Sequence, residues 1–195
     1  MKKRFNGEVG YRLLTPLMRI LFRLYYNPKI INKDVIPKDG SVLIVGNHKH
    51  LFDQCLTIMA TKRIIHYMAK KEYFDGKMAW FFKFVGCISV NRSIKDNEAV
   101  NKAIDILNNG GAIGLFPEGT RNKTKDKLLL DFKYGTVSMA KKTNSLIVPF
   151  GITGDYKFRS KNLTIKYGKP FYVDDMDLES ANKRLYKEVE RLIKE

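Results

Sequence analysis

Apolar residues follow two alternating patterns along the chain, one typical of buried strands and the other typical of helices. Short runs rich in Val, Ile and Leu predict strands. They lie at residues 41–45, 63–69, 87–90, 112–116, 146–150 and 163–167. Longer stretches with helical spacing predict helices. They lie at residues 53–61, 77–85, 96–109, 132–143 and 181–194. Strands separated by helices predict an α/β fold: a largely parallel central sheet flanked by helices, with sites at the carboxyl ends of the strands.

The N-terminal stretch has a different pattern. Residues 11–26 are crowded with Leu, Ile, Phe and Tyr, while Arg12, Arg19 and Arg23 recur at steps of seven and four and so share one helical face. Residues 1–29 carry seven basic side chains and one acidic side chain. This pattern predicts an amphipathic helix that lies in a membrane interface. The alternative is a helix packed on the core with its arginines in water.

Length and charge narrow the possible classes of protein. At 195 residues the chain can bury one substantial core, and we expect an N-terminal membrane-association segment at residues 1–36 followed by one domain at residues 37–195. The 36 Lys and Arg residues against 20 Asp and Glu residues give a formal net charge of +16. Such a surface attracts nucleic acid, an anionic bilayer or acidic ligands, and charge alone does not choose among them.

Cysteine usage and hydropathy predict the compartment. Cys55 and Cys87 are the two cysteines, and they suggest neither a disulfide framework nor a metal site, which favours a reducing, cytoplasmic setting. The N-terminus lacks a long apolar region and a small-residue cleavage pattern, so we expect no secretory signal. No segment reaches the roughly 18 to 20 apolar residues that span a bilayer, which favours a helix lying on the membrane.

Two polar segments follow predicted strands. Residues 47–53 read Asn-His-Lys-His-Leu-Phe-Asp, and residues 116–121 read Phe-Pro-Glu-Gly-Thr-Arg. The pKa of an imidazole lies near neutrality, so His48 can take a proton from an attacking hydroxyl. Asp53 can accept a hydrogen bond from the other ring nitrogen, fix the tautomer and stabilise the imidazolium. These residue types predict the activation of a hydroxyl group.

Four ordered blocks carry a resemblance to a known family. They lie at residues 47–53, 86–92, 116–121 and 147–150. Together they resemble the glycerolipid acyltransferases, specifically the 1-acylglycerol-3-phosphate (lysophosphatidic acid) acyltransferases. The resemblance implies transfer of a fatty acyl group from an acyl thioester to the sn-2 hydroxyl of lysophosphatidate, giving phosphatidate in phospholipid biosynthesis. It also implies that residues 37–195 are a catalytic domain, held peripherally at the cytoplasmic face of the cell membrane.

The resemblance implies a division of roles among the polar residues. His48 and Asp53 are catalytic, and no Ser or Cys stands beside His48 as a nucleophile, so direct attack by the acceptor hydroxyl is the simpler route. The substrate-binding residues are Arg92, Glu118, Gly119, Thr120 and Arg121. Arg121 offers a planar fork for phosphate oxygens, Arg92 is a second phosphate ligand, and the amide of Gly119 is the expected oxyanion donor.

We expect no tightly bound cofactor and no metal. The acyl donor is an acyl-carrier protein or a coenzyme A thioester, and the positive charge suits an acidic carrier, coenzyme A phosphates and anionic lipid alike. His48 and His50 are spaced like two metal ligands, but a third ligand at suitable spacing is missing. The family commonly has a small polar residue at the position of His50, so we expect the acceptor pocket to differ here.

Two other functions remain open. The chain resembles acyltransferases that act on another lysophospholipid or a lyso-aminolipid in its first and third blocks, although Arg92 with Arg121 favours a terminal phosphate. A non-catalytic basic module that binds lipid or nucleic acid is the more remote alternative. The aromatic residues cluster with aliphatic ones rather than with Lys and Arg, so we expect no nucleic-acid partner, and the intact His48 and Asp53 argue for catalysis.

Two further features concern packing. Residues 78–85 concentrate aromatic side chains, and the pattern leaves open whether they belong to the core, line an acyl-chain groove or dip into a bilayer. His66 lies inside an apolar strand, and we expect it to be a structural residue rather than a catalytic one.

Overall fold

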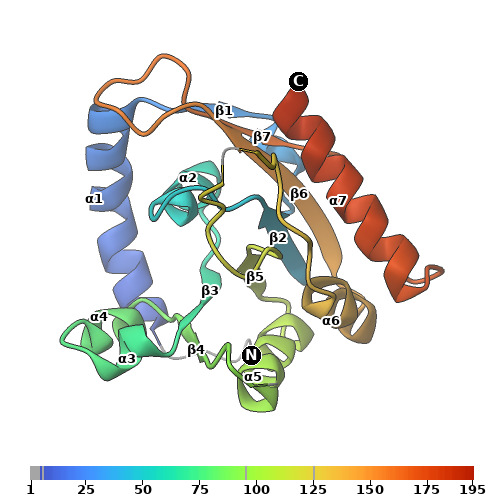
Figure 1. Ribbon diagram of the computed structural model, residues 1–195. Coiled ribbons are helices and arrows are strands. Elements are labelled where there is room, and N and C mark those ends of the chain that lie inside the picture. Colours follow the sequence, from blue (N-terminus) through green and yellow to red (C-terminus); the bar gives the residue numbers. More distant parts are fainter. Residues whose placement is uncertain (1–4, 6, 95, 125) are drawn as a thin grey trace.

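The computed structural model describes residues 5, 7–94, 96–124 and 126–195, and within them the strands form one seven-stranded sheet with helices on both faces (Figure 1). The helices are α1 (Glu8–Tyr26), η1 (Lys33–Val35, a 3-10 helix), α2 (Asp53–Ala60), α3 (Glu72–Asp75), α4 (Ala79–Phe84), α5 (Asn97–Asn108), α6 (Gly135–Thr143) and α7 (Leu178–Lys194). The strands are β1 (Lys29–Ile31), β2 (Val42–Gly46), β3 (Ile65–Lys70), β4 (Ile88–Val90), β5 (Ala112–Leu115), β6 (Leu146–Thr153) and β7 (Thr164–Tyr167). The predicted α/β fold is confirmed.

The strand order is β1-β7-β6-β2-β5-β3-β4, and each of these pairings is parallel except that of β6 with β7. The largely parallel sheet is therefore confirmed. The sequence pattern did not reveal β1, because an edge strand of three residues is too short to show a periodic signal. Since β1 lies within residues 1–36, that segment contributes a strand to the sheet as well as a helix.

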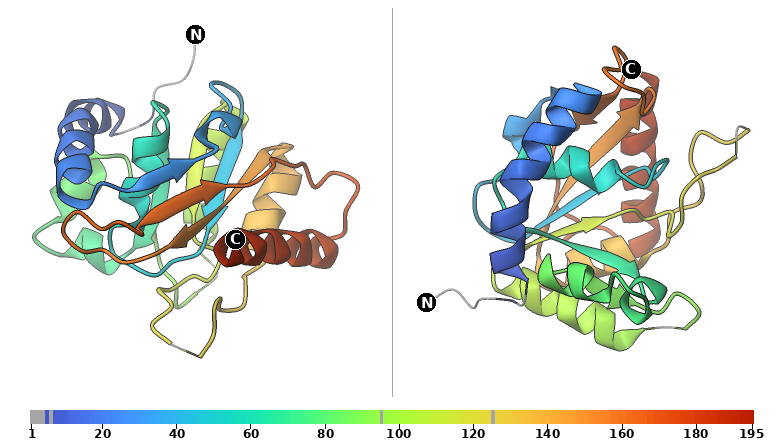
Figure 2. Two further views of the ribbon diagram at one scale, coloured as in Figure 1. Left: turned by 90° about the horizontal axis from the view of Figure 1, so that it is seen from above. Right: turned by 90° about the vertical axis from the view of Figure 1, so that its left-hand side faces the viewer.

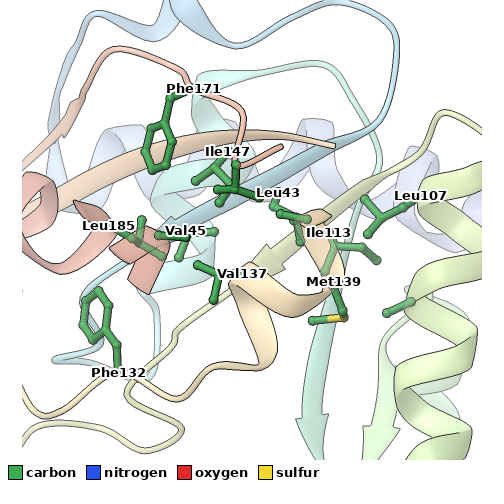
Figure 3. Close-up of a cluster of buried hydrophobic side chains, with 14 of the residues drawn as sticks. Leu43, Val45, Leu107, Ile113, Phe132, Val137, Met139, Ile147, Phe171 and Leu185 are labelled. Carbon is green, nitrogen blue, oxygen red and sulfur yellow. The ribbon is translucent and has the colours of Figure 1, made fainter. Parts of the chain in front are cut away.

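Side chains of the central strands alternate between two apolar layers. On β2, Leu43 and Val45 face the layer that includes residues of α5, α6 and α7, whereas Val42 and Ile44 face the layer that includes residues of α1 and α2. Figure 2 shows these two groups of helices on opposite faces of the sheet. Figure 3 shows the first layer, where strand residues such as Ile147 meet helical side chains. This packing fixes the register in which β2 delivers the residues that follow it.

Helix α1 packs against α2 and α4 along one face and exposes apolar side chains on the other. Tyr11 and Phe22 are buried, and Gly10 lies so close to the carbonyl of Phe84 that any side chain there would collide with it. The exposed apolar face consists of Val9, Leu13, Leu17, Ile20, Leu21 and Leu24, each more than half exposed. The helix thus packs on the core and also presents the kind of surface that a membrane interface requires.

Two of the three arginines on α1 bind within the protein. Arg19 donates from Nε to the carbonyl of Ile58 at 3.0 Å and from Nη2 to that of Thr61 at 2.5 Å, at the end of α2. Arg23 donates to the carbonyl of Pro28 at 2.9 Å. The interpretation that places all the arginines in water is therefore wrong for Arg19, which anchors α1 to the end of α2, whereas Arg23 is exposed. In the part of the chain that the structure describes, no helix is both long and apolar enough to cross a membrane.

The carboxyl ends of β2, β5, β3 and β4 lie along one edge of the sheet, because these neighbouring strands are parallel. His48 follows β2, Glu118 follows β5 and Arg92 follows β4. Ligand sites of parallel α/β sheets gather at such an edge. The expectation that both polar segments come directly after strands is confirmed.

Candidate active site

His48 and Asp53 form a hydrogen-bonded pair between β2 and α2. The Nδ1 atom of His48 lies 2.8 Å from Oδ2 of Asp53, and the backbone N–H groups of Lys49 and His50 donate to the same oxygen at 2.7 and 2.8 Å. Asp53 is fully buried and is the first residue of α2, where the helix dipole favours a negative charge. Because an ionised carboxylate only accepts hydrogen bonds, Nδ1 is the donor in this pair.

The two polar segments are locked together around His48. The backbone N–H of His48 donates to Oε1 of Glu118 at 2.7 Å, and its carbonyl accepts from the N–H of Asn122 at 2.7 Å. The imidazole also stacks on the ring of Phe116, with centroids 4.1 Å apart. These contacts join segments that are about seventy residues apart in the sequence, so the pairing of the two motifs is a property of the fold.

Glu118 is engaged on both of its carboxylate oxygens. Oε1 accepts from His48, and Oε2 accepts from the backbone N–H of Leu130 at 2.9 Å. The side chain is buried, and burial raises the pKa of Glu118, which the two backbone hydrogen bonds partly offset. The carboxylate thus connects two loops through hydrogen bonds. Its role in substrate binding stays a prediction.

The amide of Gly119 makes a hydrogen bond within its own segment. Gly119 adopts φ +70°, a conformation that favours glycine, and its N–H donates to the carbonyl of Phe116 at 3.0 Å, closing a turn. Its role as a donor to an oxyanion stays a prediction. Among the described residues, the amides of Thr120 and Arg121 have no acceptor in the protein, so they remain available to a ligand.

Arg121 lies near the first polar segment, whereas Arg92 lies farther along the carboxyl ends of the strands. Burial lowers the pKa of His50, and the charge of Arg121 contributes to that lowering while Asp53 opposes it, so the guanidinium is within electrostatic reach of the motif. Arg92 follows β4, which β3 separates from β5, a displacement of about 10 Å for two strand spacings. Thr120 is exposed. Within the described residues, neither arginine makes a hydrogen bond or an ion pair through its side chain.

Two contacts of this site were not predicted from the sequence. Tyr156, in the loop after β6, donates its hydroxyl to Oδ1 of Asp53 at 2.6 Å and stacks on His50 with ring centroids 4.0 Å apart. Asn47 is buried, and its amide group bonds the N–H and the carbonyl of Ile152 at 2.7 and 2.9 Å. Asn47 opens the first motif and could have been noticed there, but Tyr156 carries no signal in the sequence.

The chemistry of the site is that of an imidazole, a buried carboxylate and a guanidinium. Such a set can remove a proton from a hydroxyl group next to a bound anion. Over the residues that the structure covers, no three His, Cys, Asp or Glu side chains come together as the ligands of a metal ion would. Within the same residues, Nε2 of His48 has no hydrogen-bond partner, so this nitrogen is accessible to a ligand.

Known proteins resemble this chain in sequence. A 1-acyl-sn-glycerol-3-phosphate acyltransferase from Borreliella burgdorferi is 33% identical over 147 residues, which cover 74% of this chain and 58% of that protein. A protein of the same name from Bacillus subtilis is 27% identical over 181 residues, covering 90% of this chain and 89% of that protein. The chain thus spans little more than half of the first relative and most of the second.

Known structures and a family model match it as well. The crystal structure of a 1-acyl-sn-glycerophosphate (LPA) acyltransferase from Thermotoga maritima superposes with a TM-score of 0.74 at 23% identity, covering 98% of this chain and 81% of that chain, so it has the same fold. The acyltransferase family model matches residues 27–153, which is more than half of the chain and includes both polar segments. This protein therefore belongs to the acyltransferase family.

Proposed function

We propose that the protein is a 1-acyl-sn-glycerol-3-phosphate O-acyltransferase, which transfers a fatty acyl group from an acyl thioester to the sn-2 hydroxyl of lysophosphatidate and yields phosphatidate. The observation that carries the proposal is the 2.8 Å contact between His48 Nδ1 and Asp53 Oδ2, which leaves Nε2 free as a base beside an unpaired arginine. The names of the relatives from Borreliella burgdorferi and Bacillus subtilis support this choice of acceptor.

The proposed reaction needs one base and no covalent enzyme intermediate. Nε2 of His48 takes the proton of the sn-2 hydroxyl as its oxygen attacks the thioester carbonyl carbon. The tetrahedral oxyanion then collapses, the carbon–sulfur bond breaks, and the imidazolium returns the proton to the leaving thiolate. Asp53 stabilises the transient imidazolium and holds the ring in place. The products are phosphatidate and the free thiol of the carrier.

Three further groups of the second segment take part in this proposal. The amides of Thr120 and Arg121 are the candidate donors to the oxyanion, since the amide of Gly119 is used in its turn. A donor of this kind typically contributes about 100- to 1,000-fold in rate. We assign Glu118 an indirect part in the acceptor site, because its carboxylate holds the backbone of His48.

The guanidinium of Arg121 is the proposed ligand of the acceptor phosphate, with Arg92 as a second cation. Both are unpaired within the described residues, so their donors are available for a dianionic head group. The spacing of about two strands between β4 and β5 suits Arg92 to the outer part of the head group rather than to the phosphate oxygens nearest His48. Another lysophospholipid, or a lyso-aminolipid, is the alternative acceptor.

We propose that α1 seats the enzyme on an anionic membrane at its cytoplasmic face. The exposed apolar face of α1 supports this, because each of its large side chains would gain roughly 1.5 to 3 kcal/mol if it were fully buried. Trp80 and Met78 are also more than half exposed, on and next to α4, which packs beside α1. The formal charge of +16 adds attraction to anionic lipid.

The direct test measures phosphatidate formation from lysophosphatidate on anionic vesicles, with acyl-coenzyme A in one arm and acyl-acyl-carrier protein in the other. Wild type should form phosphatidate with at least one donor, and the productive arm names that donor. His48→Ala should form none above background. Phosphatidate from neither donor would remove lysophosphatidate as the acceptor, and other lysolipids would then be screened. Full activity in His48→Ala would remove the proposed mechanism.

A vesicle flotation assay tests the seating of α1 separately. Wild type should float with anionic vesicles, and Leu17→Asp with Leu24→Asp should reduce flotation about 10-fold or more, because two charges would enter the apolar face. The control is Leu128→Asp, which places one charge at an exposed leucine in the loop after β5. Equal flotation of all three proteins would contradict the assignment of this face.

A further inference from the structure

The carboxylate of Asp53 is held by four donors, and one of them comes from a distant loop. Oδ2 accepts from the His48 ring and from two backbone N–H groups, whereas the other oxygen, Oδ1, accepts from the hydroxyl of Tyr156 at 2.6 Å. Among the described residues, this hydroxyl is the partner of Oδ1. A fully buried carboxylate oxygen without a partner would be costly, so the orientation of the Asp53 carboxylate depends on Tyr156.

The hydroxyl of Tyr156 is a dependable donor. Burial raises the pKa of Tyr156 well above its usual value, and the negative charge of Asp53 raises it further, so the phenol keeps its proton throughout the physiological range. The ring is fixed on two sides: it stacks on His50 with an interplanar angle of 19°, and it meets Tyr26 edge-on with centroids 5.6 Å apart. The phenol therefore has little freedom to turn away from Asp53.

The loop that carries Tyr156, residues 154–160, is attached to the first motif and to the last turn of α1. At its start, Nζ of Lys49 donates to the carbonyl of Gly154 at 2.5 Å. Near its end, the N–H of Arg159 donates to the carbonyl of Tyr25 at 2.6 Å, and Phe158 meets the Tyr25 ring edge-on at 5.2 Å. Figure 1 shows this loop, in orange, lying against the end of α1 near β1.

We propose that Tyr156 is a positioning residue of the acyltransferase site, which fixes the Asp53 carboxylate and through it the His48 imidazole. The role of the His48–Asp53 pair in this inference rests on the proposed function. The loop ties this position to α1, so the helix that we assign to the membrane also supports the catalytic base. None of the four sequence blocks includes Tyr156.

Removal of the hydroxyl should change catalysis in a way that loss of stability would not. Without Tyr156, the carboxylate is freer to rotate, and the His48 ring leaves its productive orientation for part of the time, which lowers kcat. Negative charge that Oδ1 shared with the phenol also becomes more available to the imidazolium. The altered contact between the carboxylate and the imidazole should shift the acid limb of the pH profile, which a loss of stability alone would not do. The neighbouring charged and titratable groups Lys49, His50, Glu118 and Arg121 are unchanged in this comparison.

The experiment compares Tyr156→Phe with wild type in the vesicle assay. We expect kcat to fall about 10-fold with KM for both substrates nearly unchanged, and the acid limb of kcat/KM to shift relative to wild type. The control is Tyr167→Phe, since Tyr167 is a buried tyrosine whose hydroxyl has no partner in the described structure. The control should keep the wild-type kcat and pH profile. Wild-type kcat and an unshifted limb in Tyr156→Phe would overturn the inference.

A second variant covers the possibility that Tyr156→Phe folds poorly, which thermal unfolding would reveal. Phe158→Ala removes the ring contact with Tyr25 from a side chain that is 66% exposed, so the fold should be kept. We expect kcat to fall about 3-fold with KM retained, since the loop loses one of its attachments. An unchanged kcat would contradict the link to α1. If wild type had no activity, the proposed function itself would be contradicted. If wild type were active and His48→Ala inactive, a negative result for Tyr156→Phe would contradict only the role of Tyr156.

Discussion

The His48–Asp53 pair of the first polar segment and Arg121 of the second differ in how the protein holds them. In the first, Asp53 receives four hydrogen bonds from the protein, and the His48 ring is held by one of them and by its stacking on Phe116. In the second, the guanidinium of Arg121 makes no hydrogen bond or ion pair within the described residues. A group that is already held needs no reorganisation during the reaction, whereas an unpaired cation keeps its donors for an anion. We infer that the protein itself holds the base in position, whereas the anion site makes its hydrogen bonds only when a ligand binds.

Asp53→Asn should have the largest effect, because it disrupts the pair that the protein itself holds in position. An amide presents one acceptor and one donor group, so it cannot accept from both the His48 ring and Tyr156 in the same way. The ring would then lose its fixed tautomer. We expect kcat to fall roughly 1,000- to 10,000-fold, measured as phosphatidate formation, with little change in lysophosphatidate binding.

The matched control for this change is Asp75→Asn, since Asp75 is exposed at the end of α3. Circular dichroism and thermal unfolding should show that Asp53→Asn is folded, because loss of the fold would also abolish turnover. An Asp53→Asn enzyme that is folded and retains more than a tenth of the wild-type kcat would contradict the idea that the first segment is a preformed base.

Arg121→Ala should have a smaller effect, and of a different kind. A hydrogen bond to a charged group typically contributes about 1.5 to 3 kcal/mol, so KM for lysophosphatidate should rise about 10- to 100-fold while kcat changes little. Arg121→Lys should lie between wild type and alanine, because an ammonium keeps the charge but loses the planar fork. Steady-state kinetics over a range of lysophosphatidate concentrations measures both constants.

The control for Arg121 is Lys123→Ala, which removes an exposed cation two residues farther along the same loop. If the basic run after the motif is merely solvated, Lys123→Ala will keep the wild-type KM. An equal rise in KM for both variants would mean that the loop attracts the acceptor through its general charge. It would contradict the assignment of Arg121 as a specific ligand of the phosphate.

The parts of the site that could be predicted are those in which neighbours in sequence are neighbours in space. His48 and Asp53 belong to one short segment between a strand and a helix, so the chain itself brings them together. Parallel pairing of β2 with β5 then brings the second motif alongside the first. The α/β fold followed from the same periodic pattern, apart from short elements such as β1 and α3, whose three and four residues carry too little of it.

The remaining features depend on backbone partners or distant loops, which leave no mark in a motif. Tyr156 lies 103 residues from Asp53 and reaches it because its loop is held by α1. The amide of Gly119 is consumed by a turn, and both oxygens of Glu118 accept backbone N–H groups. Arg19 looked like part of a solvated face, yet it binds the carbonyls at the end of α2. Residue type alone could not distinguish these uses from ligand binding.

Substitution of His66 should have the smallest effect among these predictions. His66 contrasts with His48 because it is a histidine with a structural role. Its Nδ1 lies 2.7 Å from the carbonyl oxygen of Gly86, and the side chain is 3% exposed, in agreement with the structural role expected of it. Burial lowers the pKa of His66, although the Gly86 contact and the charge of Glu8 oppose that shift. Folded His66 therefore gives up its proton more readily than His66 in the unfolded chain.

The sign of the effect follows from proton counting. Between the lowered folded pKa and the unfolded value near 6.5, the unfolded chain binds more protons, so the free energy of unfolding rises with pH. The contribution of His66 to stability is fully present above about pH 6.5 and is lost as the pH falls toward the folded pKa. The slope of the free energy of unfolding with pH is at most about 1.4 kcal/mol per pH unit.

Urea unfolding of wild type and His66→Gln at pH 7.5 and 5.5 measures this contribution. His50 and Glu118 titrate in both proteins and cancel, so wild type should lose more stability than His66→Gln on acidification. Equal losses would show that His66 is no more costly to protonate in the fold than in the unfolded chain.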